Sequence, residues 1–107
     1  MISRDIQLAK KILESNELVS IPTETVYGLA GNAFQEEAVK KIYALKNRPL
    51  YNPLIVHIKS IDYLSEVATD IPEVAYDLAK EFWPGPLTMV LQKKTNIPDL
   101  VTSKKDT

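Results

Sequence analysis

The stretch that decides the fold reads Ile21-Pro22-Thr23-Glu24-Thr25-Val26-Tyr27-Gly28-Leu29. The β-branched run at residues 18–21 predicts a strand, and Pro22 ends it. Hydroxyl and backbone N–H groups that follow the carboxyl end of a strand can hold a small polar ligand. The alternative is a turn in which the threonine side chains bond to their own backbone, and the spacing alone favours that turn.

Helices and strands are predicted to alternate on both sides of this stretch. Apolar side chains recur at helical spacing in residues 5–15, 35–46 and 70–82, and residues 60–67 predict a short helix. Residues 54–58 and 87–91 are apolar runs typical of buried strands. The face of the 70–82 helix expected to point inward carries Ile71, Val74, Ala75, Leu78 and Phe82. The alternation predicts an α/β or α+β sheet protein.

Composition narrows the class of protein. The 107 residues are 45% hydrophobic and 25% charged, which is ordinary for a globular chain. No apolar run approaches the roughly 20 residues of a membrane helix, and the beginning of the chain has no secretory hydrophobic region. The absence of cysteine and the single histidine exclude disulfides, a cysteine nucleophile and a multi-histidine metal site. We therefore expect a cytoplasmic protein with no metal site of its own.

Charge is unevenly distributed although the net charge is only −1. Residues 38–61 contain no Asp or Glu but several cations, whereas residues 62–81 are predominantly acidic. This asymmetry points to an anionic ligand near the first segment, and a solvated helix face is the alternative.

The basic loop, residues 46–52, follows the second predicted helix. Lys46 and Arg48 stand where that helix ends, and Asn52 adds an amide in a proline-stiffened loop. Lysine supplies a point charge and arginine a planar fork that binds phosphate oxygens in pairs. Stabilisation of a helix carboxyl end by cations is the competing explanation. No Gly-rich phosphate loop and no dinucleotide fingerprint occurs in the chain, so neither of those nucleotide-binding motifs applies.

His57 lies in the predicted strand that follows the basic loop. A lone histidine on an apolar strand is more often a core residue than a catalyst, but this one is within reach of whatever the loop holds. The segment Phe82-Trp83-Pro84-Gly85-Pro86-Leu87-Thr88 carries two aromatic side chains that we expect in the core, beside a turn. We assign that segment no chemistry.

Together these segments resemble the YrdC/YciO family, the threonylcarbamoyl-AMP synthases. The matching motifs occur in family order and are Pro22-Thr23-Glu24-Thr25-Val26-Tyr27-Gly28-Leu29, Lys46-Asn47-Arg48-Pro49 with Asn52-Pro53-Leu54, Val56-His57, and Trp83-Pro84-Gly85-Pro86-Leu87-Thr88. The resemblance implies a YrdC-like fold, a twisted open sheet with flanking helices and a large basic cavity. Residues 1–107 would be the N-terminal part of a single such domain.

The resemblance also implies a reaction and its participants. L-Threonine takes up bicarbonate, and the carboxylated amine attacks the α-phosphate of ATP to give threonylcarbamoyl-AMP and pyrophosphate. Magnesium would accompany ATP. The product serves a downstream threonylcarbamoyl transferase machinery that modifies the adenosine next to the anticodon of tRNA.

Site residues are implied one by one. Thr25 and His57 would contact L-threonine, and Arg48 and Asn52 would contact ATP. Lys46, in the same motif, would face phosphates and share the catalytic charge neutralisation with Arg48. Thr107 aligns with a threonine that contacts the nucleotide. Because family domains are considerably longer, we expect this chain to hold only part of the site and to be inactive alone. We also expect it either to be marginally stable or to pair with another copy of itself.

Two other functions remain open at this point. One is a non-catalytic module that binds tRNA or double-stranded RNA, against which the acidic balance counts. The other is a carbamoyl-adenylate-forming relative in hydrogenase maturation, where such domains follow upstream segments that are not expected in this protein.

Overall fold

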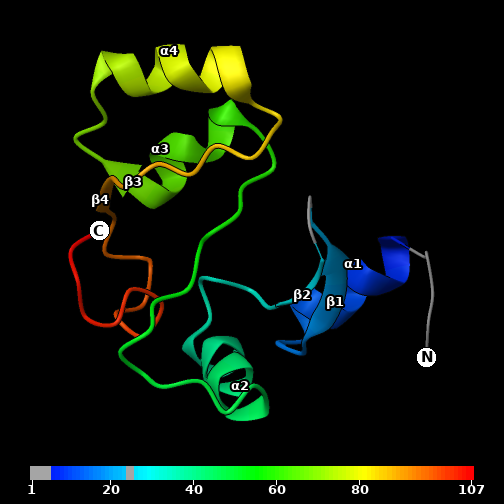
Figure 1. Ribbon diagram of the computed structural model, residues 1–107. Helices are drawn as coiled ribbons and strands as arrows, with labels where there is room; N and C mark the ends of the chain where they lie inside the picture. The colour runs from blue at the N-terminus through cyan, green and yellow to red at the C-terminus, as the bar shows by residue number, and fades with distance from the viewer. Residues whose placement is uncertain (1–5, 24–25) are drawn as a thin grey trace. The chain divides into compact units, whose positions relative to one another are not determined.

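The computed structural model describes residues 6–23 and 26–107, which form two compact units, Met1–Asn52 and Pro53–Thr107 (Figure 1). Both units combine helices with short antiparallel strands. The mixed α/β class predicted from the sequence is therefore confirmed. Within the described residues, no helix is both long and apolar enough to span a membrane.

The first unit is built around a β-hairpin between two helices. Its elements are α1 (Ile6–Glu14), β1 (Val19–Pro22), β2 (Tyr27–Ala30) and α2 (Glu36–Leu45). The strands pair antiparallel from Val19 opposite Ala30 to Pro22 opposite Tyr27. The buried core is on α2 and consists of Ala38, Val39, Ile42 and Tyr43.

Gly31 shows how closely α2 approaches the rest of this unit. A Cβ atom at Gly31 would lie 2.8 Å from Cδ2 of Leu18 and 3.4 Å from Cδ1 of Ile42. A larger residue would push these side chains aside, so glycine favours the close approach of the hairpin and α2. The glycine therefore serves packing.

Both helices of the first unit end in the same backbone motif. After α2, Asn47 N–H donates to Ala44 O (3.2 Å) and Arg48 N–H to Tyr43 O (2.9 Å). Asn47 has a left-handed φ of 50°, as the residue after the C-cap does in a Schellman motif. Asn16, with a φ of 62°, plays the same part after α1. Asparagine tolerates this conformation better than most residues, which is why both helices end where they do.

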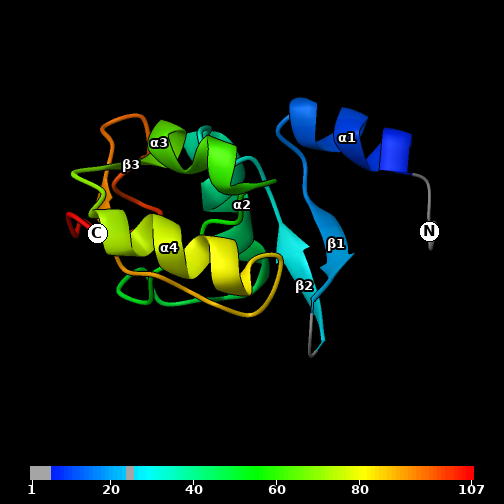
Figure 2. The same ribbon diagram turned by 90° about the horizontal axis from the view of Figure 1, so that it is seen from above.

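The second unit packs a long helix beside a short helical segment, as Figures 1 and 2 show. Its elements are η1 (Ile61–Tyr63), α3 (Leu64–Val67), β3 (Ala68–Thr69), α4 (Glu73–Phe82) and β4 (Gln92–Lys93). β3 and β4 form a two-residue antiparallel pair. The core consists of Leu64, Ala68, Ala75, Ala79, Ile97 and Val101.

The buried face of α4 differs from the predicted one. Ala75 and Ala79 are buried, but Val74, Leu78 and Phe82 are 58%, 40% and 54% exposed. Apolar side chains cover more of the surface of α4 than the rest of the unit covers. The part of the helix that is covered carries the two alanines. Burial of Phe82 was therefore a wrong prediction, while Trp83 is half-buried.

Residues 54–58 and 87–91 are extended but form no ladder with any described residue. Their exposure alternates as in a strand, and the more buried side chains are Leu54, Val56, Ile58, Leu87, Met89 and Leu91. The predicted strands are therefore not formed within the described residues, because a strand is defined by its neighbour as well as by its own sequence.

Candidate functional site

The turn of the hairpin contains the first motif. Thr23 N–H donates to Val26 O at 3.0 Å, and Val26 N–H donates to Thr23 Oγ1 at 3.2 Å. The Thr23 hydroxyl also bonds to Val26 O. For Thr23 the turn interpretation is therefore correct, since its side chain closes the hairpin. Thr25, which is predicted to contact L-threonine, lies outside the described residues, as does Glu24.

The basic loop is held by three hydrogen bonds that converge on its last residue. Arg48 Nε donates to the backbone oxygen of Asn52 at 3.0 Å, and the Tyr43 hydroxyl donates to the same oxygen at 2.9 Å. Asn52 N–H donates to Pro49 O at 3.0 Å. A carbonyl oxygen has two lone pairs and can accept both side-chain donors. The loop is thus closed on itself, with Arg48 half-buried.

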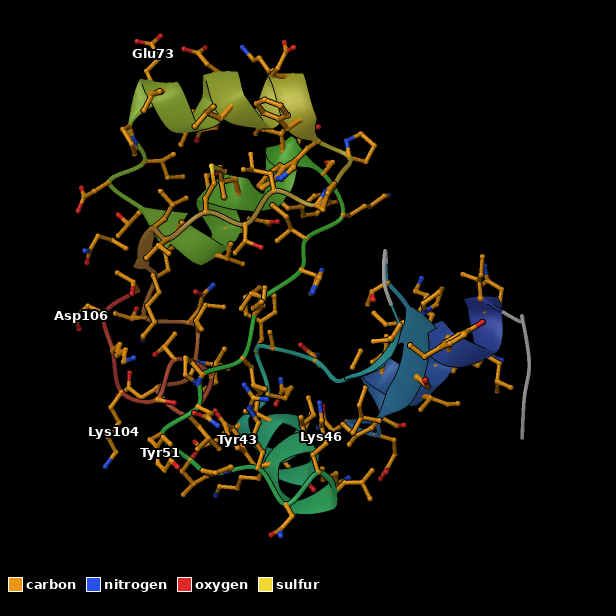
Figure 3. All side chains as sticks on the ribbon, viewed as in Figure 1. Tyr43, Lys46, Tyr51, Glu73, Lys104 and Asp106 are labelled. Carbon is orange, nitrogen blue, oxygen red and sulfur yellow. The ribbon has the colours of Figure 1, made fainter. Side chains whose placement is uncertain are left out.

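Lys46 stands at the C-cap of α2 and is exposed. Tyr43 and Lys46 lie near the carboxyl end of this helix, and Tyr51 lies in the loop that follows (Figure 3). A cation at this place is also favoured by the helix dipole, so the position alone is explained by structure. Lys46 therefore indicates a phosphate site only in combination with Arg48 and Asn52, which lie in the same loop.

Part of the predicted charge asymmetry disappears in the fold. Lys40 pairs with Glu36 at 3.7 Å, and Lys41 pairs with Glu17 at 2.7 Å while also donating to Asn16 O. These two cations of the acid-free segment are thus neutralised by acids from outside it. The remaining lysine and arginine side chains of this segment are Lys46 and Arg48 of the basic loop and Lys59.

His57 is exposed on the extended run 54–58. The interpretation as a buried core histidine is therefore wrong. Its predicted contact with threonine stays a prediction, because His57 belongs to the second unit and the basic loop to the first.

Thr107 follows a set of tight turns in the second unit. Lys93 Nζ donates to Ile97 O and pairs with Asp99, both at 3.0 Å, and its side chain is only 14% exposed. Lys93 N–H donates to Asp106 O at 2.8 Å. Lys104 and Asp106 mark these turns in Figure 3. The backbone next to Thr107 is thus anchored, while its role toward a nucleotide stays a prediction.

Of the six predicted site residues, Lys46, Arg48 and Asn52 lie together in one loop. Sequence reasoning missed Tyr43, whose hydroxyl closes that loop. The signal was present, since Tyr43 is on the apolar face of α2 yet carries a polar group that must find a partner when buried. The described residues contain no group of three or more His, Asp or Glu side chains that could hold a metal ion.

These features define a mixed α/β protein with a hydrogen-bonded basic loop directly after a helix. The family model described as "Telomere recombination", Sua5/YciO/YrdC, matches residues 11–107. The chain belongs to this family, as the resemblance of its motifs implied.

Individual relatives agree with the family. The chain is 51% identical to the threonylcarbamoyl-AMP synthase of Pyrococcus abyssi over 95% of its length, and 50% identical to that of Bacillus subtilis over 92%. A crystal structure of P. abyssi Sua5 complexed with L-threonine matches with a TM-score of 0.91 at 50% identity, over 94% of this chain. The chain spans only 30% and 28% of the first two relatives and 30% of that solved chain.

Proposed function

We propose that the complete gene product is a threonylcarbamoyl-AMP synthase, a nucleotidyltransferase of tRNA modification, and that the present chain carries its phosphate-facing loop. The observation that supports this most directly is the closed basic loop, in which Arg48 is fixed beside Lys46 and Asn52. A relative of 50% identity crystallised with L-threonine supports the amino-acid substrate.

In the proposed reaction, the amine nitrogen of L-threonine first bonds to the carbon of bicarbonate, whose hydroxyl leaves with an amine proton as water, and a carbamate results. A carbamate oxygen then attacks the α-phosphorus of ATP, and the bond to the β-phosphate oxygen breaks to release pyrophosphate. No covalent nucleophile from the protein is needed, so the protein acts by positioning and by neutralising charge.

Arg48 and Lys46 are the residues to which we assign that neutralisation. The guanidinium of Arg48 suits paired phosphate oxygens, and Lys46 adds an exposed point charge next to it. The side-chain amide of Asn52 and the hydroxyl of Thr107 would contact ATP. Magnesium would be held mainly by phosphate oxygens and water, as is usual for this ion at nucleotide sites.

Thr25 and His57 are assigned to L-threonine. A hydroxyl and an imidazole can both hydrogen-bond the polar groups of a zwitterionic amino acid. The exposure of His57 supports its access to a ligand. Because the proposed reaction uses ATP and serves tRNA modification, the protein would work in the cytoplasm. It would deliver its product to a threonylcarbamoyl transferase machinery.

A non-catalytic RNA-binding function receives less support. Lys10, Lys40, Lys41 and Lys93 each pair with an acidic side chain, which lowers the number of cations available to a phosphate backbone. RNA binding would weaken steeply with salt, whereas the proposed site requires two small ligands.

The test is threonine-dependent release of pyrophosphate from ATP by the complete gene product. L-Threonine should support turnover and 2-aminobutyrate should not, because a site that hydrogen-bonds a hydroxyl rejects the analogue lacking it by about 10⁴-fold. Equal turnover with both amino acids would contradict the assignment of Thr25. Residues 1–107 alone should release no pyrophosphate, and turnover by this chain would contradict the view that it holds only part of the site.

A further inference from the structure

We propose that Tyr43 is a positioning residue, which sets the orientation of Arg48 through the backbone oxygen of Asn52. This inference rests on the proposed function, since it concerns how the phosphate-facing loop is held. Tyr43 is itself 4% exposed and part of the α2 core, so it has no access to a ligand. Any effect on substrate must therefore pass through the loop.

Two separate contacts join Tyr43 to the loop. Its backbone oxygen accepts Arg48 N–H at 2.9 Å, which fixes where the arginine backbone leaves the helix. Its hydroxyl donates to Asn52 O at 2.9 Å, the oxygen that also accepts Arg48 Nε at 3.0 Å. Tyr43 thus holds the backbone of Arg48 directly. It also holds the Arg48 guanidinium indirectly, through Asn52 O, which accepts a hydrogen bond from both side chains.

The shared acceptor makes the arrangement sensitive to a single hydroxyl group. Without the tyrosine hydroxyl, Asn52 O keeps its bond to Arg48 Nε but loses this link to the rigid core of α2. Arginine recognises phosphate through a planar fork, so a change in the orientation of that plane weakens paired hydrogen bonds more than it weakens a point charge. The loss should therefore be specific to ATP.

Tyr43→Phe tests this inference because it removes the hydroxyl and keeps the buried ring. In the complete gene product we expect the KM for ATP to rise by roughly two- to tenfold, the range that one net hydrogen bond supports. The KM for L-threonine should stay unchanged. Tyr63→Phe is the matched control, since it removes a hydroxyl from a 41% exposed tyrosine on η1, outside the basic loop.

Hydrogen exchange supplies a second readout that does not depend on activity. In Tyr43→Phe the amide of Asn52 should exchange faster than in the parent, while amides at the centre of α2 keep their rates. If the parent neither binds nor turns over ATP, the proposed function fails and exchange alone decides the inference. Equal exchange at Asn52 in Tyr43→Phe and Tyr63→Phe, or a rise in KM shared by both substrates, would overturn the positioning role.

Discussion

The hairpin of the first unit and the extended run 87–91 of the second have similar sequence character but different outcomes. Exposure alternates along β1 and along residues 87–91. In the hairpin a turn at Thr23 and Val26 returns the chain at once, so each strand has a partner a few residues away. Residues 87–91 have no strand partner in the described part of the chain. Alternation therefore predicts an extended backbone, and pairing depends on a neighbour that local sequence does not specify.

The same contrast divides the candidate site. The basic loop is closed by hydrogen bonds between residues four and nine positions apart in the sequence. It can form wherever α2 forms. His57, in contrast, lies on the run 54–58, where no ladder with a described residue fixes its backbone. The loop residues assigned to ATP are thus positioned by contacts that are close in sequence, whereas the position of His57 depends on structure formed elsewhere.

Hydrogen exchange should give the largest difference between these regions. In the 107-residue chain, amides of residues 55–58 and 88–91 should exchange roughly a hundredfold or more faster than those in the centre of α2. The reason is that the α2 amides are hydrogen-bonded and the others have no backbone acceptor among the described residues. Protection of both runs equal to that of α2 would show that they are paired, for example with a second copy, which a mass measurement in solution would detect.

Gly85→Ala should cause a larger loss of stability than a substitution at Asn47 or Gly28. A Cβ atom at Gly85 would lie 2.4 Å from the backbone oxygen of Phe82, which cannot move aside as a side chain can. Trp83 Nε1 closes the same turn by donating to Leu87 O at 2.9 Å. We expect a loss of about 1–3 kcal/mol in the free energy of unfolding, measured by urea denaturation. An unchanged midpoint would contradict this packing at the start of run 87–91.

Asn47→Ala should have a smaller effect, in the locally closed region. Asn47 has a φ of 50°, a left-handed conformation that costs an ordinary L-residue about 1–2 kcal/mol and asparagine less, so the loss in Asn47→Ala should stay below that value. Asn47→Gly should lose no stability, because glycine is preferred after a helix C-cap. If both variants unfold at the same urea concentration, the left-handed conformation of Asn47 is wrong.

Gly28→Ala should have the smallest effect on stability. A Cβ atom there would meet only Cγ2 of Thr23, at an ordinary 3.5 Å. Alanine also costs less conformational entropy than glycine in a strand, so the change should stay within about 0.5 kcal/mol or be slightly stabilising. A loss as large as that of Gly85→Ala would show that the hairpin packs more tightly at Gly28 than its geometry indicates.

Sequence patterns predicted most elements because their signals are local. The helices α1, α2 and α4 and the strand β1 follow from periodicity and from the breaks at Pro22 and Asn47. The inward face of α4 could not be predicted, since Val74, Leu78 and Phe82 are as apolar as a core face requires and only tertiary packing selects Ala75 and Ala79.

Within the site, residue types indicated Lys46, Arg48 and Asn52, which the fold gathers in one loop. A buried tyrosine must find a partner for its hydroxyl, but the sequence does not say that the partner of Tyr43 is a carbonyl oxygen nine residues later. The exposure of His57 excludes the core-histidine alternative, which the sequence alone could not decide. Exposure on an extended run depends on what covers that run, and the histidine itself gives no signal of it.

The central claim is that the basic loop binds the phosphates of ATP, and titration calorimetry with ATP on the complete gene product tests it most directly. Arg48→Ala should weaken binding by about 1.5–3 kcal/mol, the value of a charge-assisted hydrogen bond, which is roughly ten- to a hundredfold in Kd. Lys40→Ala, which removes a cation already paired with Glu36 on the surface of α2, should leave the affinity unchanged. Equal ATP affinity in Arg48→Ala and the parent would contradict the account.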